Sequence, residues 1–156
     1  MLKFISPLIV VEDIATSRRF YEDYLGQKVL FDFGEDVQFE GGFSIHQKAH
    51  FQTLLGDERR YPITLKSNAG ELYFETNEME AAQARLKQSG AEFIHEIKEQ
   101  PWGQRAMRLY DLDGHILEIG ESMESAIVRL HDQGLSVDEI VKKTGMPKEI
   151  VEGAVD

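Results

Sequence analysis

The sequence contains no cysteine, and it has no long run of apolar residues. Without cysteine there can be no disulfide, no thiolate metal ligand and no cysteine nucleophile. No apolar stretch approaches the length of a transmembrane helix, and the apolar start of the chain lacks a signal-peptide cleavage site. These absences predict a cytoplasmic protein with no membrane partner.

Basic residues are also few, with 17 Lys and Arg against 28 Asp and Glu, so the formal net charge is −11. The basic residues are scattered along the chain, and the excess negative charge would repel a phosphate backbone, so we expect no nucleic-acid partner. An acidic surface favours solubility, and it would also favour a cationic small molecule. A hydrophobic content of 42% in 156 residues is enough for one globular domain with a small appendage.

Apolar periodicity divides most of the chain into two similar halves. The first half is expected to form a strand, a helix capped by Asp13 and ended by Gly26, and three strands, at residues 2–11, 13–25, 28–33, 37–40 and 43–48. A linker of weak pattern (49–70) follows, and then the order repeats at residues 71–76, 78–88, 92–97, 104–110 and 115–120. The repeated order predicts an α+β fold made of two paired modules.

The last two predicted strands form a hairpin around the turn residues Asp111 to Gly114. Its second strand carries Glu118 at a central position, where a purely structural hairpin would favour an apolar residue. This acidic residue in the middle of a strand is therefore a candidate functional group.

Motifs at both ends of this region carry a family resemblance. They are Val11-Glu-Asp-Ile14, Ser17, Phe20-Tyr21 and Tyr24-Leu-Gly26 near the start, and Pro101-Trp-Gly103, Arg105 and Asp111-x-Asp-Gly-His-x-x-Glu118 near the end. Together they resemble the vicinal oxygen chelate superfamily, which contains lactoylglutathione lyase, extradiol dioxygenases, fosfomycin-resistance thiol transferases and bleomycin-resistance proteins. The resemblance implies that residues 1–121 form a glyoxalase-like domain, in which two βαβββ modules curve into an open barrel-like sheet around a cavity.

Side-chain alternation along the strands predicts which residues face that cavity. Leu72, Phe74, Phe43 and Ile45 should pack against the helices. The side chains expected on the cavity side are Ser44, His46, Glu71, Tyr73, Glu75 and Glu118. One imidazole and two carboxylates from three strands suit a divalent metal such as Zn²⁺, Ni²⁺, Mn²⁺ or Fe²⁺. We therefore predict metal ligation by His46, Glu71 and Glu118.

The resemblance places the family's four metal positions at Ser6, His46, Glu71 and Glu118. Ser6 departs from the family pattern, which usually has histidine there, and a neutral hydroxyl is a poor metal ligand. The expected substrate pocket contains Ser6, Tyr73, Trp102 and Arg108. Structural alternatives exist for each ligand, because Glu71 and Glu118 could pair with an arginine such as Arg108, and His46 could be a polar edge residue. His115 is expected to be a turn residue.

The leading functional hypothesis is a glyoxalase-like, metal-dependent enzyme of the lyase or isomerase type, acting on a small oxygen-chelating substrate. The metal would serve as a Lewis acid, while Glu71 or Glu118 exchanges protons as the catalytic residue. No other cofactor site is predicted. The alternative is a metal-free binding protein of the bleomycin-resistance type, whose acidic, aromatic-lined groove holds a cationic ligand. Exposed sheet edges predict a homodimer in either case.

Residues 122–156 are expected to form a helical appendage resembling a helix-turn-helix, with a first helix over 122–133, a second helix capped by Ser136 and a last helix starting at Pro147. The last helix is acidic, so we expect a role in packing or dimerisation. A regulator that senses a ligand and contacts DNA through this tail is a third alternative.

Overall fold

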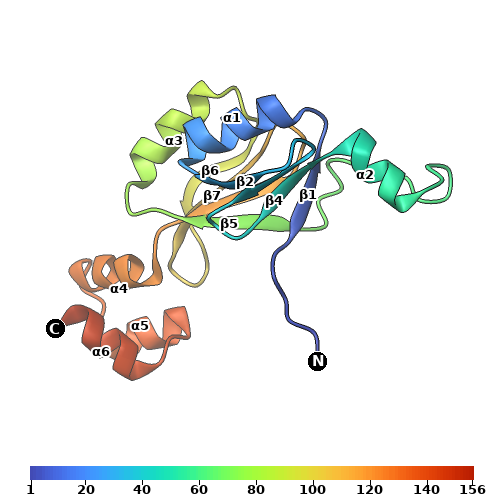
Figure 1. Cartoon of the computed structure of the whole chain (residues 1–156). Coiled ribbons are helices and arrows are strands. Elements are labelled where there is room, and N and C mark those ends of the chain that lie inside the picture. Colours follow the sequence, from blue (N-terminus) through green and yellow to red (C-terminus); the bar gives the residue numbers. More distant parts are fainter.

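A computed structural model describes the chain, residues 1–156, as two four-stranded sheets with helices (Figure 1). In the first sheet the strand order is β1-β4-β3-β2, with bounds Leu8–Val11, Ser44–Gln47, Asp36–Phe39 and Val29–Asp32. In the second the order is β5-β8-β7-β6, with bounds Glu71–Glu75, Ile116–Gly120, Arg105–Tyr110 and Phe93–Glu99. In each sheet the first and last strands of the module pair in parallel, and the other pairs are antiparallel. The predicted α+β fold of two βαβββ modules in an open sheet is confirmed.

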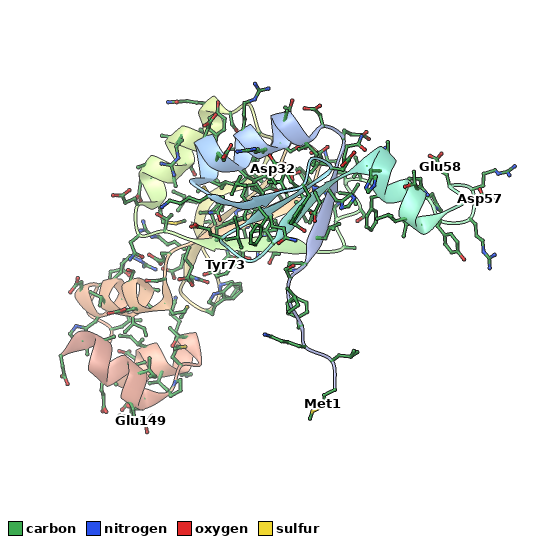
Figure 2. The ribbon with its side chains drawn as sticks, in the orientation of Figure 1. Met1, Asp32, Asp57, Glu58, Tyr73 and Glu149 are labelled. Atoms are coloured by element: carbon green, nitrogen blue, oxygen red, sulfur yellow. The ribbon has the colours of Figure 1, made fainter.

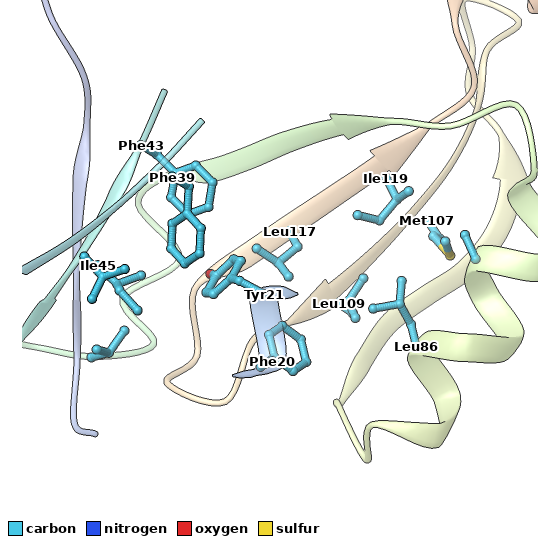
Figure 3. Close-up of a cluster of buried hydrophobic side chains, with 13 residues drawn as sticks. Phe20, Tyr21, Phe39, Phe43, Ile45, Leu86, Met107, Leu109, Leu117 and Ile119 are labelled. Carbon is cyan, nitrogen blue, oxygen red and sulfur yellow. The ribbon is translucent and has the colours of Figure 1, made fainter. Parts of the chain in front are cut away.

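Two helices, α1 (Ile14–Leu25) and α3 (Met79–Gln88), lie on the same side of the sheets. Helix α1 begins where the Asp13 carboxylate accepts a hydrogen bond from the backbone N–H of Thr16 at 2.8 Å, and it ends at Gly26 with φ +65°. Figure 3 shows the core that these helices form with both sheets, which includes Tyr21, Leu86 and Leu117. The core occupies the side of the sheets that faces α1 and α3. The opposite side of the sheets is therefore available for a functional site.

Side-chain alternation in β5 follows the prediction. Leu72 and Phe74 pack against the core, whereas Tyr73 lies on the opposite side of the sheet from α1 and α3 (Figure 2). Glu71 and Glu75 share the side of Tyr73, because side chains alternate along a strand.

The start of the chain differs from the prediction of a strand over residues 2–11. Strand β1 begins only at Leu8, and residues 1–7 form an extended N-terminal arm that leaves the domain (Figure 1). The carbonyl of Pro7 accepts a hydrogen bond from the N–H of Ser44, but no residue before Pro7 joins the sheet. Proline has no N–H for a ladder, and β4 does not extend far enough to pair with the arm.

The linker between the modules contains a helix that the sequence indicated only weakly. Helix α2 (Lys48–Leu55) begins directly after β4, because the side chain of Gln47 caps it by accepting a hydrogen bond from the N–H of His50 at 2.7 Å. The helix packs beside β4 and β1. It therefore covers the end of the first sheet where His46 lies.

The last 35 residues form a helical unit (residues 122–156) with helices α4 (Met123–Asp132), α5 (Val137–Thr144) and α6 (Lys148–Val155). The predicted cap Ser136 accepts a hydrogen bond from the backbone of α5, and Ser122, which was expected inside the first helix, caps α4 in the same way. Four buried side chains form a small core of their own, namely Ile127, Leu130, Ile140 and Val151. None of the six helices is both long and apolar enough to cross a membrane.

Candidate functional site

Two acidic side chains of the second sheet meet at one arginine. Arg108 on β7 is opposite Glu118 on β8, and β8 is flanked on its other side by β5, which carries Glu71. The Nε atom of Arg108 donates to Glu71 Oε2 at 2.9 Å, and another guanidinium nitrogen of Arg108 donates to Glu118. The three side chains therefore form one ion-paired cluster on the face away from the helices.

The two carboxylates of this cluster differ in acidity. The hydrogen bond from Arg108 is the main reason why the pKa of Glu71 is lowered. Glu118 is almost fully buried, and burial together with the neighbouring Glu71 carboxylate raises the pKa of Glu118 despite the charge of Arg108. Glu118 is thus the carboxyl of the pair that holds a proton more readily.

A chain of hydrogen bonds continues this face toward the turn between β6 and β7. The indole N–H of Trp102 donates to Gln104 at 2.9 Å, the Gln104 amide donates to the hydroxyl of Tyr73 at 2.7 Å, and that hydroxyl donates to Glu75 at 2.9 Å. Burial and the bond to Glu75 raise the pKa of Tyr73 to about 12. Gly120 makes room for this arrangement, because a Cβ there would lie 3.1 Å from the rings and amides of Tyr73 and Gln104.

We call this surface the acidic-aromatic face; its residues are Glu71, Tyr73, Glu75, Trp102, Gln104, Arg108 and Glu118. Tyr73 is 47% exposed and Trp102 is 38% exposed, so both aromatic side chains are available to a ligand. Gln104 was not among the predicted site residues. Its signal was strand alternation, since Gln104 has the same parity as Arg108 in the predicted strand over 104–110; in the structure it directly precedes β7.

His46 belongs to a different environment. Its side chain is buried on the first sheet, where a ring nitrogen lies 2.7 Å from a ring nitrogen of His50 and its ring lies against Phe51 of α2. Burial lowers the pKa of His46. Its Nδ1 and the Oδ1 of Asp36 are 4.0 Å apart, and neither atom has a hydrogen-bond partner.

The structure does not bring the predicted metal ligands together. Glu71 and Glu118 are close, but the Arg108 guanidinium pairs with both of them, and His46 lies beneath α2. No group of three or more His, Asp or Glu side chains is placed so that it could hold a metal ion. The side chains as arranged do not fit a divalent metal, and ligation by His46, Glu71 and Glu118 stays a prediction.

The predicted substrate pocket is brought together in part. Tyr73, Trp102 and Arg108 all belong to the acidic-aromatic face. Ser6 was expected on the first strand, but it lies exposed on the N-terminal arm before that strand begins, so the structure does not bring it to the other three and its role in the pocket stays a prediction.

Comparisons with known proteins agree with this architecture. The family model described as a glyoxalase-like domain matches residues 4–124. A protein of unknown function from Agrobacterium tumefaciens is 38% identical, with 79% of this chain and 96% of that chain covered and a TM-score of 0.70. No curated protein shows a significant match.

Two more distant structures share the fold. A glyoxalase-related enzyme from Fulvimarina pelagi is 21% identical over 78% of this chain and 89% of its own, with a TM-score of 0.66. A glyoxalase/bleomycin resistance protein/dioxygenase from Nocardioides is also 21% identical, over 78% and 84% of the two chains, with a TM-score of 0.57. The matched segment and the two βαβββ modules lead to one conclusion: the chain belongs to the glyoxalase-like domain family of the vicinal oxygen chelate superfamily.

Proposed function

We propose that this protein binds a cationic small molecule on the acidic-aromatic face and needs no metal to do so. The observation that carries the proposal is the position of Arg108, whose guanidinium pairs with the two carboxylates that a metal-dependent relative would direct at its metal. The proposal corresponds to the metal-free alternative, similar to bleomycin-resistance proteins.

The charge of this face favours a cation. Glu71, Glu75 and Glu118 supply three carboxylates against the single guanidinium of Arg108, and the whole chain is strongly acidic. A negative surface raises the local concentration of cations and speeds their association. Because Arg108 already neutralises part of the Glu71 and Glu118 pair, Glu75 beside Tyr73 is the carboxylate best placed to meet a ligand cation.

The exposed aromatic rings supply the second part of the site. A cation over the face of a tyrosine or tryptophan gains about 0.5–1 kcal/mol when the ring is exposed, and more when water is excluded. The Trp102–Gln104–Tyr73–Glu75 chain of hydrogen bonds fixes both rings beside the carboxylate. The ligand class that fits is therefore a cation with an aromatic or apolar body.

Trp102 is the only tryptophan of the chain, so its fluorescence reports directly on this face. We expect benzyltrimethylammonium, titrated in the presence of EDTA, to change the Trp102 emission saturably. Tyr73→Ala and Glu75→Gln should each weaken binding about tenfold, which corresponds to about 1.4 kcal/mol. Neutral benzyl alcohol should bind much more weakly.

Glu96→Gln is the matched control, because Glu96 lies on the same sheet but pairs with Lys87 at 2.6 Å, away from the acidic-aromatic face. A titration without a saturable response, or equal binding of the cation and the alcohol, would refute the proposal. If Zn²⁺ instead binds tightly and Glu118→Gln abolishes that binding, the metal-dependent enzyme hypothesis takes its place.

A further inference from the structure

A separate pocket lies where the two modules meet. It has a volume of about 360 Å³, and its walls come from β1, the linker residues 63–70, the start of β5 and the turn before β8. This volume is within the range of small-molecule sites, about 300–1,000 Å³. Of the acidic-aromatic face, only Glu71 contributes to its lining, and that carboxylate is already paired with Arg108.

The walls of this junction pocket are largely apolar. The apolar side chains that line it include Leu8, Val10, Ile63, Leu65, Leu72 and Ile116. The polar residues of the lining are Thr64, Lys66, Ser67 and Asn68 on the linker, together with Glu71 and His115. His115 is the only imidazole among them. A mainly apolar pocket with a small number of fixed polar groups is the usual form of a small-molecule site.

The ring and the backbone of His115 are both held by the buried Asp111. Its Nδ1 lies 3.0 Å from Oδ2 of the buried Asp111, and its backbone N–H donates to Oδ1 of the same residue at 2.8 Å. Asp111 is itself fixed by the hydroxyl of Tyr21, which donates to it at 2.7 Å. Because a carboxylate fixes Nδ1, it also determines the orientation and the proton position of the ring.

The other ring nitrogen, Nε2, is free to meet a ligand. It makes no hydrogen bond within the chain, and it is not among the buried polar atoms that lack a partner, so it is accessible; His115 itself is part of the pocket lining. Burial opposes a charged ring, but the hydrogen bond and charge of Asp111, with Asp113 nearby, raise the pKa of His115 above its ordinary value. This shift favours the ring that is protonated at both nitrogens, and in that form Nε2–H is a hydrogen-bond donor.

The linker residues 63–70, which form one wall of the pocket, contain strained backbone, and their side chains bind to the second sheet. Lys66 and Asn68 have φ values of +55° and +59°, and they are the only residues other than glycine with positive φ. Such conformations are unfavourable for residues with a side chain, and they persist where surrounding contacts determine them. Here Lys66 pairs with Glu92 at 2.7 Å, and Tyr110 donates to Asn68 at 2.7 Å. The fastened linker keeps the pocket open.

We propose that the junction pocket binds a small carboxylate with an apolar body, whose carboxylate accepts a hydrogen bond from Nε2–H of His115 while its body lies between β1 and the linker. A charge-assisted hydrogen bond of this kind is about twice as strong as a neutral one. The site differs in place and in ligand charge from the acidic-aromatic face.

The test uses the full-length protein and compares benzoate with benzamide, its neutral isostere, by NMR titration. Benzoate should bind at least about tenfold more tightly than benzamide and shift the ring resonances of His115. His115→Gln should remove this preference while benzamide binding stays the same. Leu65→Trp, which fills the pocket, should abolish binding of both compounds.

His95→Gln serves as the control, because His95 lies on β6, outside the lining of the junction pocket, and the one hydrogen bond of its ring is to the backbone carbonyl of Glu96. Tyr73→Ala, which disables the acidic-aromatic face, should leave benzoate binding unchanged, so the two proposals can fail separately. Absence of benzoate binding, equal binding of the two compounds, or unchanged binding in His115→Gln overturns the assignment.

Discussion

At the scale of the residue, Asp111 illustrates how one buried carboxylate organises a turn. Four donors point at it: the Tyr21 hydroxyl, the His115 ring, and the backbone N–H groups of Asp113 and His115. Burial opposes the charge, but these hydrogen bonds outweigh it and lower the pKa of Asp111. The turn between β7 and β8 is thereby tied to helix α1, which carries Tyr21.

This pair predicts a pH-dependent stability. The folded pKa of His115 is raised, so its contribution is complete below the unfolded pKa near 6.5 and is lost as pH rises through the higher folded value. The folded pKa of Asp111 is lowered, so its contribution is complete above its unfolded value and is lost only in acid. His115→Gln should therefore reduce the free energy of unfolding more at pH 5.5 than at pH 9.

Urea denaturation at the two pH values measures this difference. His131→Gln is a suitable control, since His131 lies on helix α4, outside the Asp111 network. An equal cost of His115→Gln at both pH values would contradict the assignment of the Asp111–His115 ion pair.

The alternation of side chains along the strands predicted which face of the sheet each residue occupies, but it did not predict which residues pair with one another. It placed Glu71, Tyr73 and Glu118 on one face correctly, because direction depends only on strand parity. It left open whether Arg108 or a metal would meet the carboxylates, since that choice depends on the register between β7 and β8, which brings Arg108 opposite Glu118. His115 was assigned to the turn alone because its partner, Asp111, is oriented by Tyr21 from a distant helix.

At the scale of the element, helices were predicted where apolar residues recur with helical spacing, and most securely where a capping residue precedes them. Helix α1 has both, and its predicted limits were confirmed. Helix α2 buries none of its own residues, so it carries no clear stripe, and its start depends on the Gln47 side chain. Its position over His46 is a tertiary contact that periodicity does not contain. This one helix therefore accounts for much of the difference between the predicted and observed surroundings of His46.

The helical unit is attached to the second sheet mainly through charged groups around Glu121. This carboxylate is 2% exposed and accepts from the backbone N–H of Arg105 at 2.8 Å and from the Arg129 guanidinium at 2.7 Å. Arg129 also donates to the carbonyl of Gly103 at 2.6 Å, and Lys143 pairs with Glu99 at 2.7 Å. Glu121 is the buried charge at the centre of this attachment, and the bonds to Gly103 and Glu99 surround it.

Replacing that charge tests the attachment. Glu121→Gln leaves the Arg129 and Arg105 guanidinium groups without their buried partner, so it should lower the free energy of unfolding by about 2–4 kcal/mol. Glu80→Gln is the control, because Glu80 meets Arg105 from an exposed position and should cost less than about 1 kcal/mol. Urea unfolding followed by Trp102 fluorescence measures both. Equal effects of the two substitutions would show that the charge of Glu121 is not what fastens the helices.

At the scale of the whole molecule, the most unusual surface is the N-terminal arm. Met1, Leu2, Phe4 and Ile5 are each more than 70% exposed, and none belongs to the core. Stable domains rarely leave a group of large apolar side chains in water, since each costs about 25 cal/mol per Å² of exposed apolar area. The edge strand β2 exposes a second apolar surface, where the rings of Phe31 and Phe33 stack.

We expect the protein to form a homodimer in which the arm packs on a second copy of the chain. Light scattering of the full-length protein at micromolar concentration should give twice the mass of the 17.8 kDa chain. Removal of residues 2–6 should shift the equilibrium to the monomer, because it removes the apolar side chains of the arm while β1 stays complete. Substitution of Lys3 by Ala is the control. A full-length monomer, or a dimer that survives the truncation, contradicts this expectation.

The order of strands in the second sheet also determines when the chain can fold during its synthesis. Strand β8 is the last strand to be made, yet it lies between β5 and β7 and pairs with both. The second half of the domain therefore cannot close until Gly120 has left the ribosome, and until then β5 has no hydrogen-bonded neighbour. The helical unit follows β8 in the chain, and the contacts of its own small core are local in sequence, so this core can form quickly. While residues 122–156 are being synthesised, β8 is already free of the ribosome. It can therefore insert between β5 and β7 before synthesis of these helices is complete.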